Sequence, residues 1–80
     1  MIARVVLPRL GDTVDEVVII EWLVTAGQHV EIGMPLIRVE TDKVEVDVES
    51  QHAGIVRELF VVEGDEIKTG SALCDIDTVQ

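Results

Sequence analysis

A lysine between two acidic segments is the residue of this sequence best placed to take part in chemistry. The stretch VETDKVEVDVES, from Val39 to Ser50, holds five acids and one base, Lys43, and the chain has only one other lysine, Lys68. Apolar residues follow Lys43 at every second position, which is typical of a strand with one buried face. The stretch therefore predicts either a primary amine displayed for a partner enzyme or an ordinary solvated charge.

Other kinds of site find little support in the sequence. One cysteine, Cys74, excludes an internal disulfide and a multi-cysteine zinc site, and its match to Ile37 in the repeat described below predicts a half-buried strand thiol. The two histidines, His29 and His52, lack a partnering nucleophile motif and metal spacing, and the acids form no EF-hand loop. We expect both histidines in surface turns, and neither a catalytic nor a metal site.

Composition favours one small β domain spanning residues 1–80. The chain has 80 residues, of which 48% are hydrophobic and only two, Trp22 and Phe60, are aromatic. The apolar residues are mostly valine, isoleucine and leucine, whose β-branched members favour strands. A formal charge of −10 opposes binding to nucleic acid or to anionic membranes. No apolar run approaches the ~20 residues that a membrane-spanning helix needs.

An internal repeat organises the chain. The segment EWLVTAGQHVEIGMPLIRVE overlays ELFVVEGDEIKTGSALCDID, so that Gly27 and Gly33 match Gly64 and Gly70. Matched glycines indicate positions where the backbone needs positive φ or close approach. Each half reads as a long strand, a glycine turn, a very short strand, a second glycine turn and a further strand. With one leading strand per half, we expect Ile2–Leu7, Glu16–Val24, Gln28–Ile32, Leu36–Thr41, Val44–Glu49, Gly54–Val62, Glu66–Lys68 and Ala72–Thr78.

Eight strands in two related halves predict an all-β fold, a flattened barrel or sandwich of two four-stranded antiparallel sheets with quasi-twofold symmetry. Asp42 and Lys43 then form a two-residue turn, for which type I geometry is expected because neither residue is glycine. Val44, Val46 and Val48 are expected to face the core, with the intervening acids outside. Lys43 would stand at one end of the domain and the chain terminus at the other.

The residues around this turn resemble a known family. ETDKVEVDVES, preceded by GQHVEIGMPLIRV and followed by GIVRELFVVEGDEIKTGSAL, is similar to the lipoyl domain of the dihydrolipoyl acyltransferases of 2-oxoacid dehydrogenase complexes. The resemblance runs from LPRLGDTV at Leu7 to about Thr78. It implies the same eight-stranded barrel and a lipoic acid amide-linked to Lys43. The domain would be a carrier and not an enzyme by itself.

The resemblance also implies residues for recognition. Around the turn these are Glu40, Thr41, Asp42 and Val44, of which Asp42 and Val44 would help a ligase select Lys43 over Lys68. The loop RLGDTV, in the family a neighbour of the lysine turn, would contribute to recognition by the decarboxylase. Its alternative reading is a plain strand connector. The residues carried over from this loop are Leu10, Gly11, Asp12 and Thr13.

Two departures and two alternatives accompany the resemblance. The chain has DEVVII at Asp15 to Ile20 where family members often have a glycine, and Gln28 where they have aspartate, which weakens any assignment to one complex. A biotin carrier domain shares the fold, but that family typically has methionine on both sides of its lysine, where this chain has Asp42 and Val44. An unmodified interaction module is the other alternative.

Partners and location follow from the resemblance as expectations. A lipoate ligase or lipoyl transferase would modify the domain. A thiamine-diphosphate 2-oxoacid decarboxylase, an acyltransferase core and dihydrolipoyl dehydrogenase would then use it, with the domain itself monomeric. The N-terminal segment reads as a strand and not as a targeting peptide. We expect a bacterial or archaeal cytoplasm, or the mitochondrial matrix if a presequence has been removed.

Overall fold

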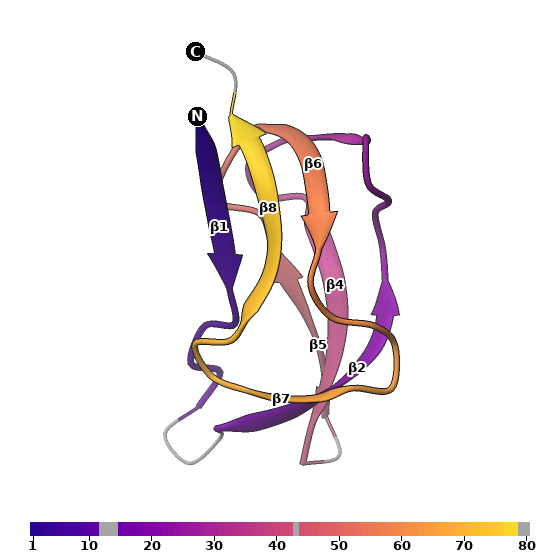
Figure 1. Cartoon of the computed structure of the whole chain (residues 1–80). Coiled ribbons are helices and arrows are strands. Elements are labelled where there is room, and N and C mark those ends of the chain that lie inside the picture. Colours follow the sequence, from indigo (N-terminus) through magenta and orange to yellow (C-terminus); the bar gives the residue numbers. More distant parts are fainter. Residues whose placement is uncertain (12–14, 43, 79–80) are drawn as a thin grey trace.

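The computed structural model describes residues 1–11, 15–42 and 44–78, and these form strands without a helix (Figure 1). The predicted all-β fold is confirmed. The strands are β1 (Ile2–Val6), β2 (Glu16–Trp22), β3 (His29–Val30), β4 (Pro35–Thr41), β5 (Val44–Glu49), β6 (Gly54–Leu59), β7 (Glu66–Lys68) and β8 (Ala72–Thr78).

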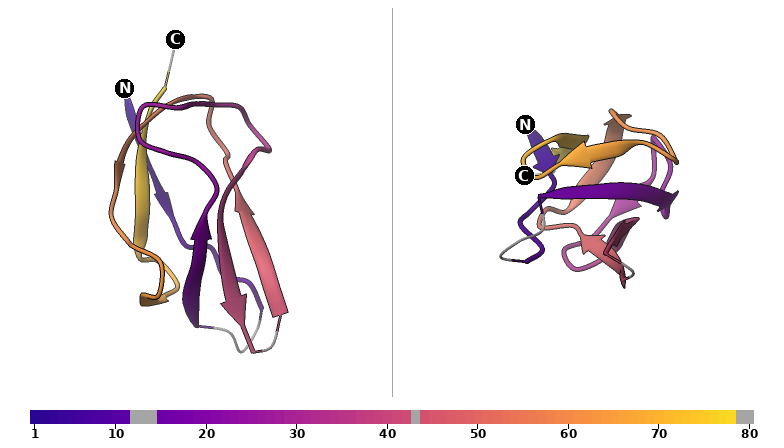
Figure 2. Two further views of the ribbon diagram at one scale, coloured as in Figure 1. Left: turned by 90° about the vertical axis from the view of Figure 1, so that its right-hand side faces the viewer. Right: turned by 90° about the horizontal axis from the view of Figure 1, so that it is seen from below.

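Two four-stranded antiparallel sheets face each other, as Figure 2 shows. One sheet has the order β1-β8-β6-β3 and the other has the order β5-β4-β2-β7. The repeat maps β6, β3 and β8 onto β2, β7 and β4, so the two orders are equivalent position by position. The predicted quasi-twofold arrangement is thus present in the strand order itself.

The equivalence extends to the register of individual residues. Arg4 lies opposite Asp75 in the β1–β8 pair, and Asp47 lies opposite Arg38 in the β5–β4 pair. The two ion pairs therefore occupy equivalent places with their charges exchanged, with Nε–Oδ1 distances of 3.0 Å and 2.9 Å. Each sheet also has its β-bulges at equivalent positions. The internal repeat is therefore preserved in the pairing of individual residues.

The matched glycines have the backbone conformation that the repeat predicts. Gly27 and Gly64 have φ values of 92° and 95°, and Gly33 and Gly70 have 93° and 90°. A side chain is disfavoured at such angles, so these turns depend on glycine. The N–H groups of Gly27 and Gly64 also donate equivalent hydrogen bonds, to the carbonyl oxygens of Val56 and Ile19.

Aliphatic side chains from both sheets fill the space between the layers. Leu36, Ile37 and Val39 of β4 meet Leu73, Cys74 and Ile76 of β8, and all six are fully buried. Trp22, which the repeat aligns with Leu59, is half-buried against this core, and its Nε1–H donates to the carbonyl oxygen of Val61 at 2.8 Å. Interdigitated aliphatic side chains of this kind supply most of the stability of a small sheet sandwich.

Some predicted details are wrong. Strands β1, β2, β3 and β6 end one to three residues earlier than predicted, because strand pairing stops before the apolar run ends. In addition, β3 starts one residue later than predicted and β4 one residue earlier. Cys74, predicted to be half-buried, is completely buried because β8 is an interior strand, between β1 and β6.

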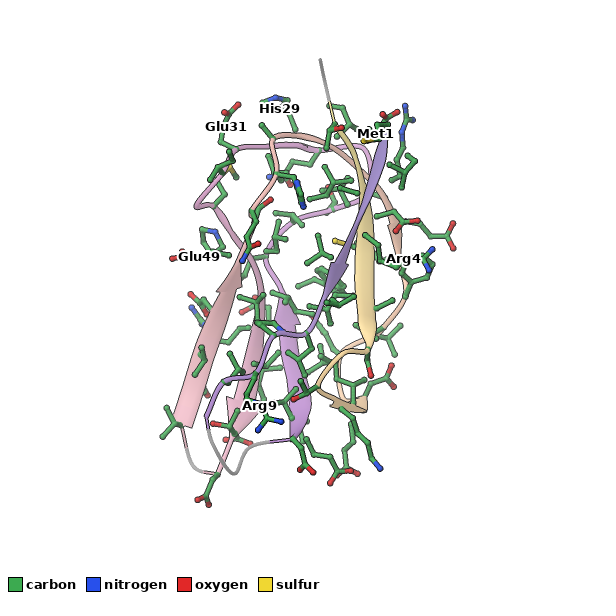
Figure 3. The ribbon with its side chains drawn as sticks, turned by 90° about the vertical axis from the view of Figure 1, so that its left-hand side faces the viewer. Met1, Arg4, Arg9, His29, Glu31 and Glu49 are labelled. Carbon is green, nitrogen blue, oxygen red and sulfur yellow. The ribbon has the colours of Figure 1, made fainter. Side chains whose placement is uncertain are left out.

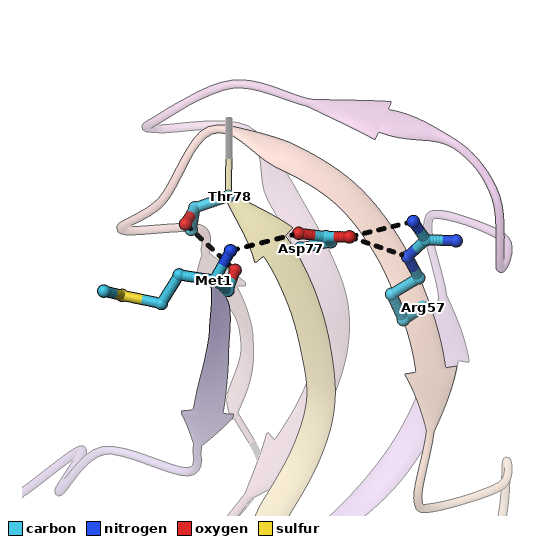
Figure 4. A network of polar contacts seen from close by, with 4 residues as sticks. All are labelled: Met1, Arg57, Asp77 and Thr78. Carbon is cyan, nitrogen blue, oxygen red and sulfur yellow. Dashed lines mark hydrogen bonds and ion pairs between the residues drawn. The ribbon is translucent and has the colours of Figure 1, made fainter. Parts of the chain in front are cut away.

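The first and last strands are fastened together at one end of the molecule, here called the terminal end (Met1 and Thr78). The N-terminal amine lies 3.4 Å from Asp77 Oδ1, and Arg57 donates to Asp77 Oδ2 from Nη2 at 2.8 Å (Figure 4). The Arg57 hydrogen bond, together with the N-terminal amine, holds the pKa of Asp77 below its usual range. The backbone N–H of Thr78 also donates to the carbonyl oxygen of Met1.

Replacement of Gly54 by alanine should destabilise the fold strongly. A Cβ at Gly54 would collide with the carbonyl oxygen of Asp77 and lie 2.8 Å from its carbonyl carbon, and backbone of a paired strand cannot yield as a side chain does. We expect Gly54→Ala to lower the free energy of unfolding by about 3 kcal/mol in urea titrations. Glu58→Ala, at an exposed position of the same strand, should change it by less than about 0.5 kcal/mol. Equal effects of the two substitutions would contradict this packing.

The Cys74 thiol should be protected from alkylation in the folded protein. Desolvation by burial, with a smaller contribution from the Asp75 charge, raises the pKa of Cys74 from 9.0 to about 11. The thiolate is the reactive form, so iodoacetamide at pH 8 should react at least about 100-fold more slowly with the native protein than with the urea-unfolded protein. Comparable rates under the two conditions would show that β8 opens readily.

Candidate functional site

The hairpin of β4 and β5 is paired along its whole length up to the predicted turn. Its register begins at Pro35 opposite Glu49 and ends at Thr41 opposite Val44. The connection therefore consists of residues 42 and 43 alone. Lys43 itself lies outside the described residues, so its predicted display stays a prediction. The described hairpin places its neighbours at the end of the molecule opposite the terminal end (Figure 1). We call this the turn end (Thr41, Asp42 and Val44).

Asp42 has a φ of 25°, so the predicted type I turn is wrong at this residue. A type I turn needs negative φ at both central positions, whereas the primed turns of tight hairpins need positive φ at the first. Primed turns match the right-handed twist of paired strands, and aspartate tolerates positive φ better than most residues. Strand twist thus outweighs the intrinsic preference for negative φ.

The valines of β5 are buried progressively away from the turn. Val48 is 5% exposed and Val46 packs partly against the core, as predicted. Val44 is 56% exposed, so the prediction that it faces the core is wrong. It is the first residue of an edge strand, and it lies beyond the side chains that fill the space between the sheets. The intervening acids are exposed as predicted: Glu45, Asp47 and Glu49.

Two carboxylates without an ion pair lie beside the turn end. Exposed Glu40 lies directly opposite exposed Glu45, a like-charged cross-strand pair that costs stability. Across the described parts of the chain, neither carboxylate has an ion pair within 4 Å. The repeat equivalent of Glu40 is Asp77, which Arg57 neutralises, but the position equivalent to Arg57 holds Ile20. The two ends therefore differ in whether this acid is paired, although their backbones are equivalent.

The other predicted recognition residues are only partly described. Thr41 is buried, at 8% exposure, and Glu40 and Asp42 are exposed. Leu10 packs partly against the core and Gly11 is half-buried, while Asp12 and Thr13 lie outside the described residues. Figure 3 shows Arg9, from the same segment, toward the turn end. The described part of this segment thus runs toward the turn end, and its role in recognition stays a prediction.

A groove between β1 and β5 is a feature that the sequence did not predict. These strands form the edges of different sheets on the same side of the sandwich, and Figure 3 looks onto the space between them, with Glu49 labelled. Only the tertiary arrangement brings them face to face, so no local sequence signal could have indicated the groove. Its lining comprises Arg4, Val5, Val6, Pro8, Val48, Glu49, Gln51 and His52.

Neither histidine belongs to a cluster of chemical groups. His29 Nδ1 lies 3.2 Å from Glu31 Oε2 on the surface. The backbone N–H of His52 donates to Ser50 Oγ, which in turn donates to the His52 carbonyl oxygen. Within residues 1–11, 15–42 and 44–78, no three His, Cys, Asp or Glu side chains are grouped to hold a metal ion. The described residues also contain no helix that could span a membrane.

Known proteins resemble this chain over most of its length. It is 41% identical over 70 residues to the dihydrolipoyllysine-residue succinyltransferase component of the 2-oxoglutarate dehydrogenase complex of Staphylococcus saprophyticus, covering 88% of this chain and 16% of that protein. It is 38% identical over 77 residues to the lipoamide acyltransferase component of the branched-chain alpha-keto acid dehydrogenase complex of Bacillus subtilis, covering 96% and 18%. The chain thus spans less than a fifth of the length of these curated relatives.

A solved structure and a family model agree with this similarity. The lipoyl domain of the 2-oxoglutarate dehydrogenase complex from Azotobacter vinelandii superposes with a TM-score of 0.74 at 23% identity, over 92% of this chain and 94% of that domain, which shows the shared fold. The family model described as "Biotin-requiring enzyme", which covers biotin and lipoyl attachment, matches residues 3–76. Since that match takes in nearly the whole sequence, the chain belongs to the biotin/lipoyl attachment family.

Proposed function

We propose that this chain is a lipoyl carrier domain in which Lys43 bears an amide-linked lipoyl group. The observation that carries the proposal is the pairing of β4 and β5 up to Thr41 and Val44, which leaves a two-residue connection at one end of a molecule 37 Å long. The motif ETDK supplies a lysine in that connection. Relatives named as dihydrolipoyllysine acyltransferase components support lipoate as the attached group.

The described residues beside Lys43 fit such a modification. Asp42 and Val44 are both exposed, so a ligase can approach the connection from solvent. Thr41 is buried and anchors the hairpin immediately before the turn, so we assign it a structural role within the recognition set. A bound lipoyl group would supply a dithiolane that can accept an acyl group together with two electrons.

The protein contributes position and charge. A hairpin paired to its last residue limits the conformations of the turn, so less entropy is lost at each docking event. Amide formation at Lys43 removes one positive charge and changes the formal charge from −10 to −11. Glu40 and Glu45 keep the surface beside the turn acidic, which favours encounter with basic partner surfaces.

We propose that the domain visits several enzymes in turn. A lipoate ligase or lipoyl transferase would load Lys43. A thiamine-diphosphate 2-oxoacid decarboxylase, an acyltransferase core and dihydrolipoyl dehydrogenase would then use the loaded domain. Tethering keeps the carried group at an effective concentration on the order of mM beside each active site. Recognition by the decarboxylase is assigned to the loop residues, of which Leu10 and Gly11 are described: Leu10, Gly11, Asp12 and Thr13.

The parent protein and its location are part of the same proposal. We place residues 1–80 as one lipoyl domain of an acyltransferase chain, in the cytoplasm of a bacterium or archaeon or in the mitochondrial matrix. The domain carries groups for the enzymes of the complex and is not itself a catalyst.

Biotin is the second candidate for the attached group. The fold and the family admit it, since biotin carriers are members of the same family. The residues beside Lys43 argue against biotin, because this chain has Asp42 and Val44 where biotin carriers typically have methionines. An unmodified interaction module would require that Lys43 be dispensable.

Intact-mass measurement of the purified chain tests the proposal. After co-expression with a lipoate ligase in lipoate-supplied cells, we expect one lipoyl adduct on the wild-type chain and none on Lys43→Gln. Lys68→Gln, the matched control, should be modified as fully as the wild type. An adduct that persists in Lys43→Gln, a biotinyl mass, or no adduct at all would refute the assignment.

A further inference from the structure

Lys68 is a second primary amine at the turn end. It closes β7, and its neighbour Ile67 packs against the core, so exposed Glu66 and Lys68 lie on the outer face of the sheet. Its backbone pairs with Glu16 of β2. For the chain as far as the structure describes it, Lys68 Nζ has no ion pair within 4 Å. The amine is therefore open to solvent and to any group that can reach it.

The sheet register places Lys68 level with the turn. Glu40 of β4 and Glu66 of β7 both lie opposite Val18 of β2, so they are two strand spacings apart, or roughly 10 Å. Both strands run antiparallel to β2 and hence parallel to each other. Asp42 is two residues beyond Glu40, just after β4 ends, and Lys68 is two residues beyond Glu66, so we infer a similar separation for these two residues. Figure 1 shows β7 near the turn end.

An arm attached next to Asp42 is long enough to span this gap. Residue 43 is one peptide unit, about 3.8 Å, from Asp42. With C–C bonds of about 1.5 Å, an extended lipoyl-lysine arm reaches on the order of 14 Å, and the Lys68 side chain adds about 6 Å. The combined reach of about 20 Å exceeds the roughly 14 Å inferred between the two attachment points.

We propose that Lys68 is an intramolecular acyl acceptor, a second modification site that takes acyl groups from a thioester on the arm. The proposal rests on the carrier function proposed above. The uncharged Lys68 Nζ attacks the thioester carbonyl carbon, a C–N bond forms, and the C–S bond breaks. The proton lost by nitrogen goes to the departing sulfur, so an amide and a free thiol result. No oxidant, reductant or further reactant is needed.

The chain contains an internal control for this reaction. Its remaining amine, the N-terminal one, is at the terminal end and lies 3.4 Å from Asp77 Oδ1. The arm cannot cover the 37 Å length of the molecule to reach it. The other bases are arginines: Arg4, Arg9, Arg38 and Arg57. Transfer through the tether should therefore label Lys68 alone, whereas reaction with a free acyl donor would label the N-terminus as well.

The experiment follows acyl transfer within the loaded domain. Lipoylated chain is reduced with a phosphine, charged briefly with a small acyl thioester, desalted and incubated at pH 8 at several protein concentrations. Peptide mass mapping then measures acylation at each amine. We expect acyl groups on Lys68 at least about tenfold above the N-terminus, at a rate independent of protein concentration because the tether supplies the acyl group. Unlipoylated chain treated identically should show no such excess.

A charge-conserving variant relocates the amine. Lys68→Arg combined with Arg57→Lys keeps the net charge and moves the second lysine to a position beside Asp77 at the terminal end. The acyl group should then appear on neither position 57 nor position 68, while the thioester is lost only by hydrolysis. Hydrolysis without labelling of wild-type Lys68, equal labelling of Lys68 and the N-terminus, or a rate proportional to concentration would overturn the proposal.

A synthetic arm separates this proposal from the lipoyl assignment. Lys43→Cys coupled to a maleimide-linked thioester of matching length tests the reach to Lys68 even if no ligase modifies the wild-type chain. Labelling of Lys68 from this arm supports the inferred geometry whatever group the natural chain carries. If neither arm labels Lys68, the inference is wrong, whereas the proposed carrier function is unaffected.

Discussion

Continuous antiparallel pairing of β4 with β5 is the constraint on which the remaining features depend. Pairing that persists to Thr41 and Val44 allows the chain only two residues in which to reverse direction. That limit accounts for the positive φ at Asp42. It also accounts for the exposure of Val44, which belongs to the strand by its hydrogen bonds but lies outside the core. A longer connection would relax all of these features at once.

The two ends of the molecule have equivalent strand arrangements but different ion pairs. At the terminal end, Asp77 is neutralised by Arg57 and the N-terminal amine, and the first and last strands are joined. At the turn end, the equivalent acid, Glu40, faces another acid and has Ile20 in place of the arginine. A duplicated fold therefore pairs this acid with cations at one end and leaves the equivalent acid without an ion pair at the other. We regard this asymmetry as the physical basis of a carrier with one working end.

Much of this structure could be read from the sequence because the repeat is explicit. Matched glycines gave four left-handed turns, and alternation after Lys43 gave the bounds of β5. The turn type at Asp42 could not be read, because sheet twist, a property of the paired strands, decides it against local preference. The groove between β1 and β5 and the level of Lys68 with the turn depend on which strands become neighbours across the sandwich. Local sequence does not encode these relations.

The exchanged charges of the two equivalent ion pairs affect which edge strand pairs with which sheet. Because the sheets are so alike, β1 could in principle add to β4, and β5 to β8, with every bulge in register. That misassembly would set Arg4 against Arg38 and Asp47 against Asp75, turning two attractions into two repulsions. In a chain of two similar halves, the reversed charges of these edge strands therefore favour the native pairing of β1 with β8 and of β5 with β4.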